Sequence, residues 1–250
     1  PILIGQLGTI VVGFADTAMV GHHSTAELAS ASFVNNLFNI AIFTLLGFSY
    51  GITPIVGALF GAGKRNDIGA MMRNAIVANL GFGLLVGAIM LAVYFNLGRL
   101  GQPVELLPLI RPYYLIYLSG IVPLALFNAF AQWAYAINRT RMPMWIILIS
   151  NVVNIGGNYA FIYGRCGMPE MGLNGAGVST LLARVFCAVA IIVIFCTRRD
   201  YGIYRAGLKS GKLTGRSLKE ITFTSVPVSL QMGFESGSFT AAAVMAGWLG

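Results

Sequence analysis

The chain has 250 residues, of which 57 % are hydrophobic and only 10 % are charged, and its formal net charge is +8. A soluble domain is typically about 25 % charged and needs those charges to stay dispersed, so this composition excludes a soluble fold. The basic residues fall in short gaps between long apolar runs, where they indicate membrane orientation and argue against a nucleic-acid partner.

Seven apolar runs follow one another along the chain, and each is long enough for the roughly 20 helical residues that cross a bilayer. They cover residues 1–21, 29–60, 70–98, 109–137, 144–164, 175–197 and 221–249. The second run is too long for one upright helix, so its first turns are expected outside the hydrocarbon. We therefore predict an all-α polytopic membrane protein, with a bundle of six transmembrane helices and a seventh transmembrane helix.

The distribution of Lys and Arg predicts the orientation of these helices. Twelve of the 16 basic residues lie in the gaps after the second, fourth and sixth runs, and three lie in the opposite gaps. Positive charge favours the cytoplasmic side of a membrane, so the N-terminus is expected in the cytoplasm.

The start and the end of the chain share a thin similarity. With a shift of 226 residues, Pro1 falls on Pro227, Met19 on Met245 and Gly21 on Gly247. We expect a six-helix lobe over 1–197, a basic cytoplasmic linker over 198–219, and the first helix of a second lobe over 220–250. Six is an even number, so two such lobes would share one orientation. On this interpretation the chain is a fragment that lacks most of its C-terminal lobe.

Two acidic residues, Asp16 and Glu235, lie well inside apolar runs. A carboxylate in the hydrocarbon costs at least about 3 kcal/mol on insertion scales, and a bound proton or cation relieves that cost. Each acid is therefore a candidate site for H+, Na+ or an organic cation. The alternative is a structural acid that is hydrogen-bonded to a neighbouring helix.

The fifth run carries amides on one face, because Asn151, Asn154 and Asn158 are spaced i, i+3 and i+7. Amide oxygens can coordinate Na+ or share a proton with a carboxylate, although such amides also bond helices together. Arg184, a basic residue inside the sixth run, is expected to bond backbone carbonyls between helices rather than to neutralise an acid.

Other polar residues in the runs are given structural interpretations. Two pairs at i, i+4 spacing could line an aqueous cavity, but hydrogen bonds between helices are the favoured interpretation. Two adjacent histidines are interpreted as interfacial residues without metal-ligand spacing. These residues are Asn35 and Asn39, Asn128 and Gln132, and His22 and His23.

Two motifs that would indicate a metalloprotease or an ATPase are missing from the sequence. HExxH and a complete GxxxxGK[ST] loop do not occur, and we expect no enzyme and no ATP-binding site on this chain. Transport, if it occurs, would be driven by an ion gradient.

Four stretches together resemble one transporter family. PILIGQLGTIVVGFADTAMVGH, GALFGAGKRND, NVVNIGGNYAFIYGRCGMPEMGLNGAGVST and SVPVSLQMGFESGSFTAAAVMAGWLG are similar to the multidrug and toxic compound extrusion (MATE) transporters, and most to their NorM-like bacterial branch. The resemblance runs in order along all 250 residues. It implies two six-helix lobes with a cleft between them, in the bacterial inner membrane. It also implies export of cationic, amphipathic compounds in exchange for H+ or Na+, with no further cofactor.

The same resemblance implies roles for individual residues. The ion-coupling site would be formed by Asp16, Asn154, Asn158 and Thr180. If the coupling ion is Na+, the first three of these residues would be its ligands. Glu235, together with Asp16, would bind the cationic substrate across the cleft. The expected partners are small cationic molecules, the lipid bilayer and the C-terminal lobe of the same chain.

Two alternatives remain open at this point. A flippase for lipid-linked sugars belongs to the same superfamily, but its cavity should be strongly basic to hold a pyrophosphate. A seven-helix receptor or sensor requires a complete chain with its N-terminus outside, against the distribution of basic residues. A carboxylate with amides and a hydroxyl serves H+ or Na+ equally, so neither the ion nor the substrate is defined.

Overall fold

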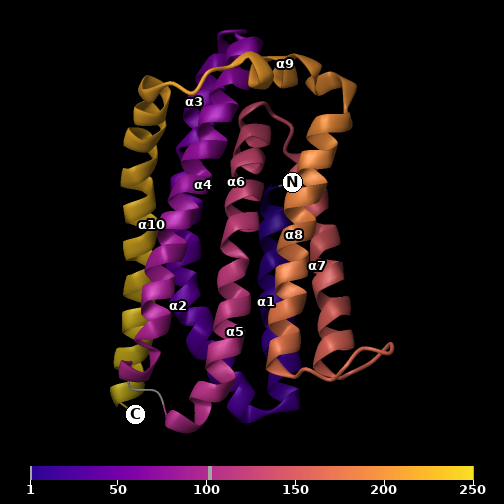
Figure 1. Cartoon of the computed structure of the whole chain (residues 1–250), viewed down its shortest axis with the longest axis vertical. Coiled ribbons are helices and arrows are strands. Elements are labelled where there is room, and N and C mark those ends of the chain that lie inside the picture. The colour runs from indigo at the N-terminus through magenta and orange to yellow at the C-terminus, as the bar shows by residue number, and fades with distance from the viewer. Residues whose placement is uncertain (1, 101–102, 250) are drawn as a thin grey trace. The chain divides into compact units, whose positions relative to one another are not determined.

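The computed structural model describes residues 2–100 and 103–249, and every regular element in these residues is a helix. This confirms the predicted all-α fold (Figure 1). Three short 3-10 turns are η1 (Leu97–Arg99), η2 (Val104–Leu106) and η3 (Arg199–Tyr201). The α-helices are α1 (Ile2–His23), α2 (Thr25–Tyr50), α3 (Ile52–Gly61), α4 (Arg65–Phe95), α5 (Leu107–Ser119), α6 (Ile121–Ala136), α7 (Arg141–Ile162), α8 (Leu173–Thr197), α9 (Gly202–Ser210) and α10 (Gly215–Leu249).

Six helical spans in the described residues are long and apolar enough to cross a membrane. They coincide with the first six predicted runs, and the seventh run lies within α10. The six spans are Ile2–His23, Thr25–Gly61, Arg65–Phe95, Val104–Ala136, Arg141–Ile162 and Leu173–Thr197.

The second span contains two helices, because α2 ends and α3 begins on either side of Gly51. The second apolar run thus forms one span of two helices, while the prediction that its first turns lie outside the hydrocarbon stays a prediction. A Cβ added to Gly51 would lie 2.7 Å from the Cα of Ser225 in α10, and one added to Gly47 would lie 2.9 Å from the Cα of Ser229. The Ser229 hydroxyl also donates a hydrogen bond to the Thr44 carbonyl, at 2.8 Å. Glycine therefore lets α2 and α10 approach to backbone contact.

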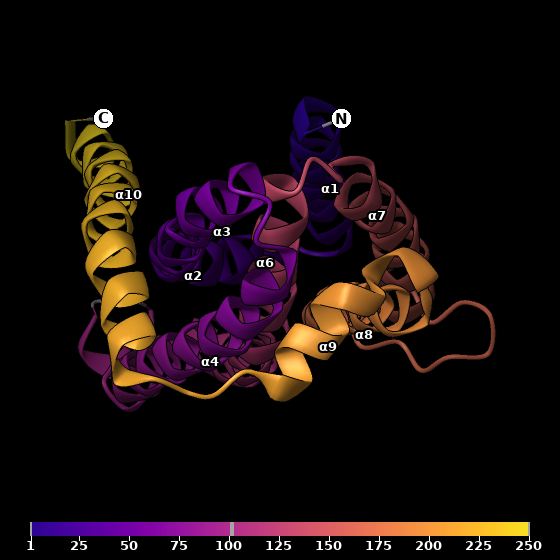
Figure 2. The same cartoon turned by 90° about the horizontal axis from the view of Figure 1, so that it is seen from above.

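The chain divides into two units, which are described separately. The first unit comprises Pro1–Asn35, Gly87–Phe127 and Thr140–Ile191, and the second comprises Asn36–Val86, Asn128–Arg139 and Ile192–Gly250. In the first unit α1 lies beside α7 in both views (Figure 1, Figure 2). Small residues allow this approach, since a Cβ on Gly8 would lie 2.8 Å from the Asn151 amide nitrogen.

In the second unit, the predicted linker over 198–219 contains a folded helix, α9, which crosses the N-terminal end of α4 (Figure 1). The two helices meet at Gly69 and Gly207, whose Cα atoms are so close that a Cβ on Gly69 would lie 2.8 Å from the Cα of Gly207. The fully buried Trp133 packs edge-on against the rings of Tyr201 and Tyr204, at 5.1 and 5.4 Å between centroids. The α10 helix starts at Gly215, while the proposed lobe boundaries at 197 and 220 stay a prediction.

The segment after α9 is held by the buried side chain of Asn74 in α4. Its amide nitrogen donates to the carbonyl of Lys212 at 3.2 Å, and its oxygen accepts from the Thr214 amide at 3.0 Å. The neighbouring Arg73 donates to the Gly211 carbonyl at 2.8 Å. These bonds give the stretch between α9 and α10 a defined path although it has no regular structure.

Candidate functional site

The side chain of Asp16 is half-buried on the side of α1 that faces α7. Its Oδ1 accepts a short hydrogen bond from the amide nitrogen of Asn158. The carboxylate therefore faces a neighbouring helix, as ionisable residues in membrane-spanning helices usually do.

A chain of hydrogen bonds leads from this carboxylate to α8. The Asn158 amide nitrogen also donates to Asn154 Oδ1 at 3.3 Å, and Asn154 in turn donates to the Thr180 hydroxyl oxygen at 3.3 Å. Asn154 is 3 % exposed and Asn158 is fully buried. The structure thus brings together the four residues that the resemblance assigns to the ion site, while their roles stay a prediction.

The oxygen atom Oδ1 of Asn158 is buried and has no hydrogen-bond partner among the described residues. A buried amide oxygen without a donor is costly, and a cation or a hydroxyl group can satisfy it. Na+ is bound by oxygen ligands, so the carboxylate, the two amide oxygens and the Thr180 hydroxyl form a suitable donor set. In the residues that the structure describes, no cluster of His, Cys, Asp or Glu could hold a metal.

The third amide of the stripe, Asn151, does not join this chain. Its amide nitrogen is buried next to Gly8 of α1 and lacks a partner among the described side chains. Asn151 lies on the same face of α7 as Asn154 and Asn158, as its spacing predicts. It is nearer to the N-terminal half of α1, next to Gly8, than to Asp16. It therefore serves as a natural comparison for the two amides of the site.

Arg184 lies near this site without an ion pair to it in the described structure. Its guanidinium lies over the Tyr117 ring, 4.3 Å from the centroid, and donates to the Tyr117 carbonyl at 3.4 Å. Gly120 makes room for it, because an added Cβ would lie 2.9 Å from Arg184 Cδ. The carbonyl bond agrees with the structural interpretation of Arg184, and no ion pair joins its guanidinium to Asp16 among the described residues.

Sequence patterns did not identify the tyrosines near the site. Tyr113 is 4 % exposed, and its hydroxyl donates to Asn35 Oδ1 at 3.4 Å. Tyr163, just after α7, donates to the carbonyl of Met19 at 2.9 Å, one turn from Asp16 along α1. Tyrosines are frequent in the apolar runs, so no periodic signal marked these two.

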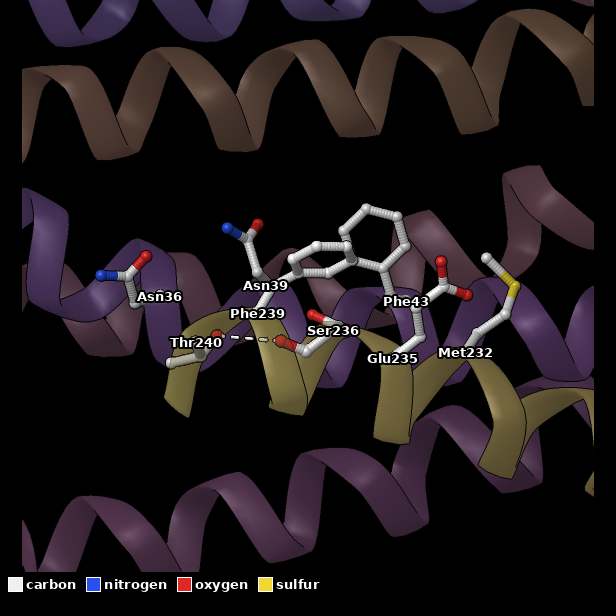
Figure 3. Close-up of a pocket in the computed structure, with 8 residues that line it drawn as sticks. All are labelled: Asn36, Asn39, Phe43, Met232, Glu235, Ser236, Phe239 and Thr240. Atoms are coloured by element: carbon white, nitrogen blue, oxygen red, sulfur yellow. Dashed lines mark hydrogen bonds between the residues drawn. The ribbon is translucent and has the colours of Figure 1, made fainter. Parts of the chain in front are cut away.

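Glu235 belongs to the second unit, where it is exposed at a cavity of about 320 Å³ between α2 and α10 (Figure 3). Asn39 also lines this cavity, although the sequence interpretation gave it a role in helix bonding. The remaining lining residues combine two phenyl rings, a thioether and further polar groups: Asn36, Phe43, Met232, Ser236, Phe239 and Thr240. No Lys or Arg is among the described residues that line it. A carboxylate beside aromatic faces can bind an organic cation whose charge is carried on a largely apolar molecule.

Of the other polar residues singled out in the sequence, Gln132 and His23 have side-chain contacts, whereas the buried amide nitrogen of Asn128 has no hydrogen-bond partner among the described residues. Gln132 accepts a hydrogen bond from the Thr53 hydroxyl at 2.9 Å, as expected for a bond between helices. His22 is exposed, whereas His23 contacts Glu27 and Glu170.

Comparisons with known proteins identify the family to which the chain is similar. Residues 1–160 match the MatE family, and residues 109–236 also match a family described as lipid II flippase MurJ. A probable multidrug resistance protein NorM from Geobacillus kaustophilus is 31 % identical over 255 residues, covering 100 % of this chain and 55 % of its own length. The chain thus spans about half the length of the curated relatives it matches.

Solved structures share the fold. An outward-facing multidrug resistance MATE family transporter of the MOP superfamily superposes with a TM-score of 0.82 at 21 % identity, covering 93 % of this chain and 51 % of that one. A MOP superfamily transporter from Pyrococcus furiosus, described by a reversed polarity of its binding pocket, superposes with a TM-score of 0.81 at 19 % identity, covering 93 % and 50 %.

Proposed function

The chain belongs to the MatE family, and we propose that the full protein exports cationic, amphipathic compounds in exchange for H+ or Na+ bound at Asp16. It is a multi-pass integral membrane protein, and we place it in the bacterial inner membrane with a cytoplasmic N-terminus. The first lobe would cover 1–197, and a second lobe would begin at 220 after the basic linker. The length of the curated relatives supports this division.

The observation that carries the proposal is the hydrogen-bonded carboxylate of Asp16 on a membrane-spanning helix, without an ion pair in the described structure. An unneutralised carboxylate in this position costs roughly 3 kcal/mol or more. A proton neutralises it directly. Na+ would be held by Asp16 together with the oxygens of Asn154, Asn158 and Thr180.

Exchange follows if cation and substrate favour different states of the transporter. A ligand shifts a conformational equilibrium only by its difference in affinity for the two states. The ion site lies in the first unit and Glu235 lies in the second, so each ligand has its own carboxylate. Ion binding at Asp16 and substrate binding near Glu235 would then bias the same equilibrium in opposite directions.

The lining of the Glu235 cavity supports a cationic substrate. Phe43, Met232 and Phe239 offer apolar contact, and Glu235 offers the one formal charge among the described lining residues. A flippase for lipid-linked sugars remains the second candidate, because residues 109–236 match the MurJ family. Its pyrophosphate would meet a carboxylate here instead of the basic residues it requires. The match to a transporter family gives the receptor interpretation no support.

The test is efflux of a fluorescent organic cation from vesicles that carry the full-length protein, with a pH gradient or a Na+ gradient imposed separately. Asp16→Asn should abolish gradient-driven efflux, whereas Asp67→Asn, the same change at an exposed residue of α4, should leave it intact. Glu235→Gln should weaken efflux of a cation about tenfold or more and spare an uncharged compound of similar shape. Full gradient-driven efflux by Asp16→Asn would refute the assignment.

A further inference from the structure

A cluster of one histidine and two glutamates lies at the C-terminal end of α1, the end nearer to Asp16. His23 is the last residue of α1, Glu27 lies in the first turn of α2, and Glu170 lies in the segment between α7 and α8. His23 Nδ1 is 2.8 Å from Glu27 Oε2, and His23 Nε2 is 3.1 Å from Glu170 Oε1. The imidazole ring thus connects the α1–α2 turn to the α7–α8 segment.

Glycines in the α7–α8 segment allow the backbone to pass close to both acids. Gly164 and Gly172 have φ values of +62° and +51°, which are accessible to glycine at low cost. A Cβ on Gly172 would lie 2.4 Å from Glu27 Oε1, and one on Gly164 would lie 2.9 Å from the Cβ of Glu170. Glu27 therefore packs directly against this segment, and Glu170 is folded back onto Gly164 within it.

The geometry depends on the protonation state of His23, because both ring nitrogens face carboxylate oxygens. Only the doubly protonated imidazolium donates to both acids, whereas a neutral ring directs one nitrogen lone pair at a carboxylate. The titratable groups that face the ring are Glu27 from α2, Glu170 from the α7–α8 segment and Tyr163, whose ring centroid is 6.2 Å away. Histidine is the side chain that ordinarily changes charge between about pH 5 and pH 8.

These contacts add to the packing of α1 against α7 and lie at the C-terminal end of α1. In α1 the buried residues are Gly5 and Val20. Asp16, Met19 and His23 are spaced i, i+3 and i+7, so they share one face of α1. Along that face Asp16 accepts from Asn158, the Met19 carbonyl accepts from Tyr163, and His23 contacts Glu170. His23 lies about 10 Å beyond Asp16 along the helix axis.

We propose that His23 is a positioning residue for the ion-coupling site: its imidazolium, held between Glu27 and Glu170, fixes the end of α1 against the α7–α8 segment. Loss of that proton releases the contact and loosens α1, and with it the pairing of Asp16 and Asn158. The transport consequence rests on the proposed function, but the pH-dependent contact does not.

The contact is tested by amide hydrogen exchange on the full-length protein in nanodiscs, without substrate or gradient. Exchange of residues 163–172 and 14–23 is measured at about pH 5 and about pH 8, after correction for the intrinsic pH dependence. In the wild type, protection from exchange should fall roughly two- to fivefold at the higher pH. This factor corresponds to the free energy that a partly exposed ion pair contributes. His23→Gln and Glu170→Gln should both weaken that pH response.

His22→Gln is the matched control, because His22 is an exposed histidine one residue away. It should keep the wild-type response, and equal responses of His22→Gln and His23→Gln would overturn the proposal. The second readout is the pH profile of organic-cation efflux, which His23→Gln should flatten by about twofold. An unchanged efflux profile would refute the positioning role, whereas a wild type that exports no cation would refute the proposed function alone.

Discussion

Replacing Asn158 by leucine removes the amide that links the Asp16 carboxylate to Asn154, while the branching at Cγ is retained. The change deletes two hydrogen bonds and the buried oxygen Oδ1, which has no partner among the described residues. A hydrogen bond to a charged group contributes about 1.5–3 kcal/mol, and a lost contact of that size to Na+ weakens binding roughly 10- to 150-fold. When a Na+ gradient drives efflux, we expect the Na+ concentration that half-saturates organic-cation efflux to rise by that factor.

The assay is initial efflux from vesicles over a series of Na+ concentrations, with the amount of folded protein checked by thermal unfolding. Asn151→Leu is the matched control, because it makes the same replacement two turns away at an amide whose nitrogen is buried without a partner. Removing such a group is close to neutral, so the control should shift half-saturation by less than about threefold. Equal Na+ dependence of Asn158→Leu and the wild type would refute Asn158 as an ion ligand.

Two further predictions concern the packing of α9, and of the segment that follows it, against α4. Gly69→Ala should lower the thermal unfolding temperature, because the new Cβ would lie 2.2 Å from the Tyr204 carbonyl oxygen, and the overlap should cost about 1–3 kcal/mol. Gly57→Ala, with no neighbour within 4 Å, should be neutral or stabilising, and a similar loss there would contradict this account. Asn74→Ala should destabilise the protein by about 1–3 kcal/mol and speed proteolysis at 211–214, and unchanged cleavage would show that its bonds to Lys212 and Thr214 do not hold that segment.

The helices and the row of amides on one face of α7 could be predicted from the sequence because their signals are local, whereas Thr180 was assigned by the family resemblance alone. Apolar length determines a membrane span, and the i, i+4 spacing of Asn154 and Asn158 places both amides on one helix face. Contacts between distant segments gave no such signal. Glu170 is 147 residues from His23, and it lies against Gly164, one of the glycines with positive φ in the α7–α8 segment.

The break in the second span was also beyond sequence reasoning. Gly51 looks like any other glycine in an apolar run, and its role depends on Ser225 of α10 lying directly against it. The same limit applies to Tyr113 and Tyr163, whose partners lie on α2 and α1. Long-range packing, rather than periodicity, determines which of many similar residues acquires a specific contact.

The backbone contact between α2 and α10 constrains how relatives of this protein can be recombined. In a chimera with a crossover within 198–219, α2 would come from one parent and α10 from another. A parent with alanine at position 47 or 51 would then place a methyl group within 3 Å of the Cα of Ser229 or Ser225. Such crossovers should succeed only when the α2 parent has glycine at both positions, so pairs of parents can be screened by inspecting two sites before any chimera is made.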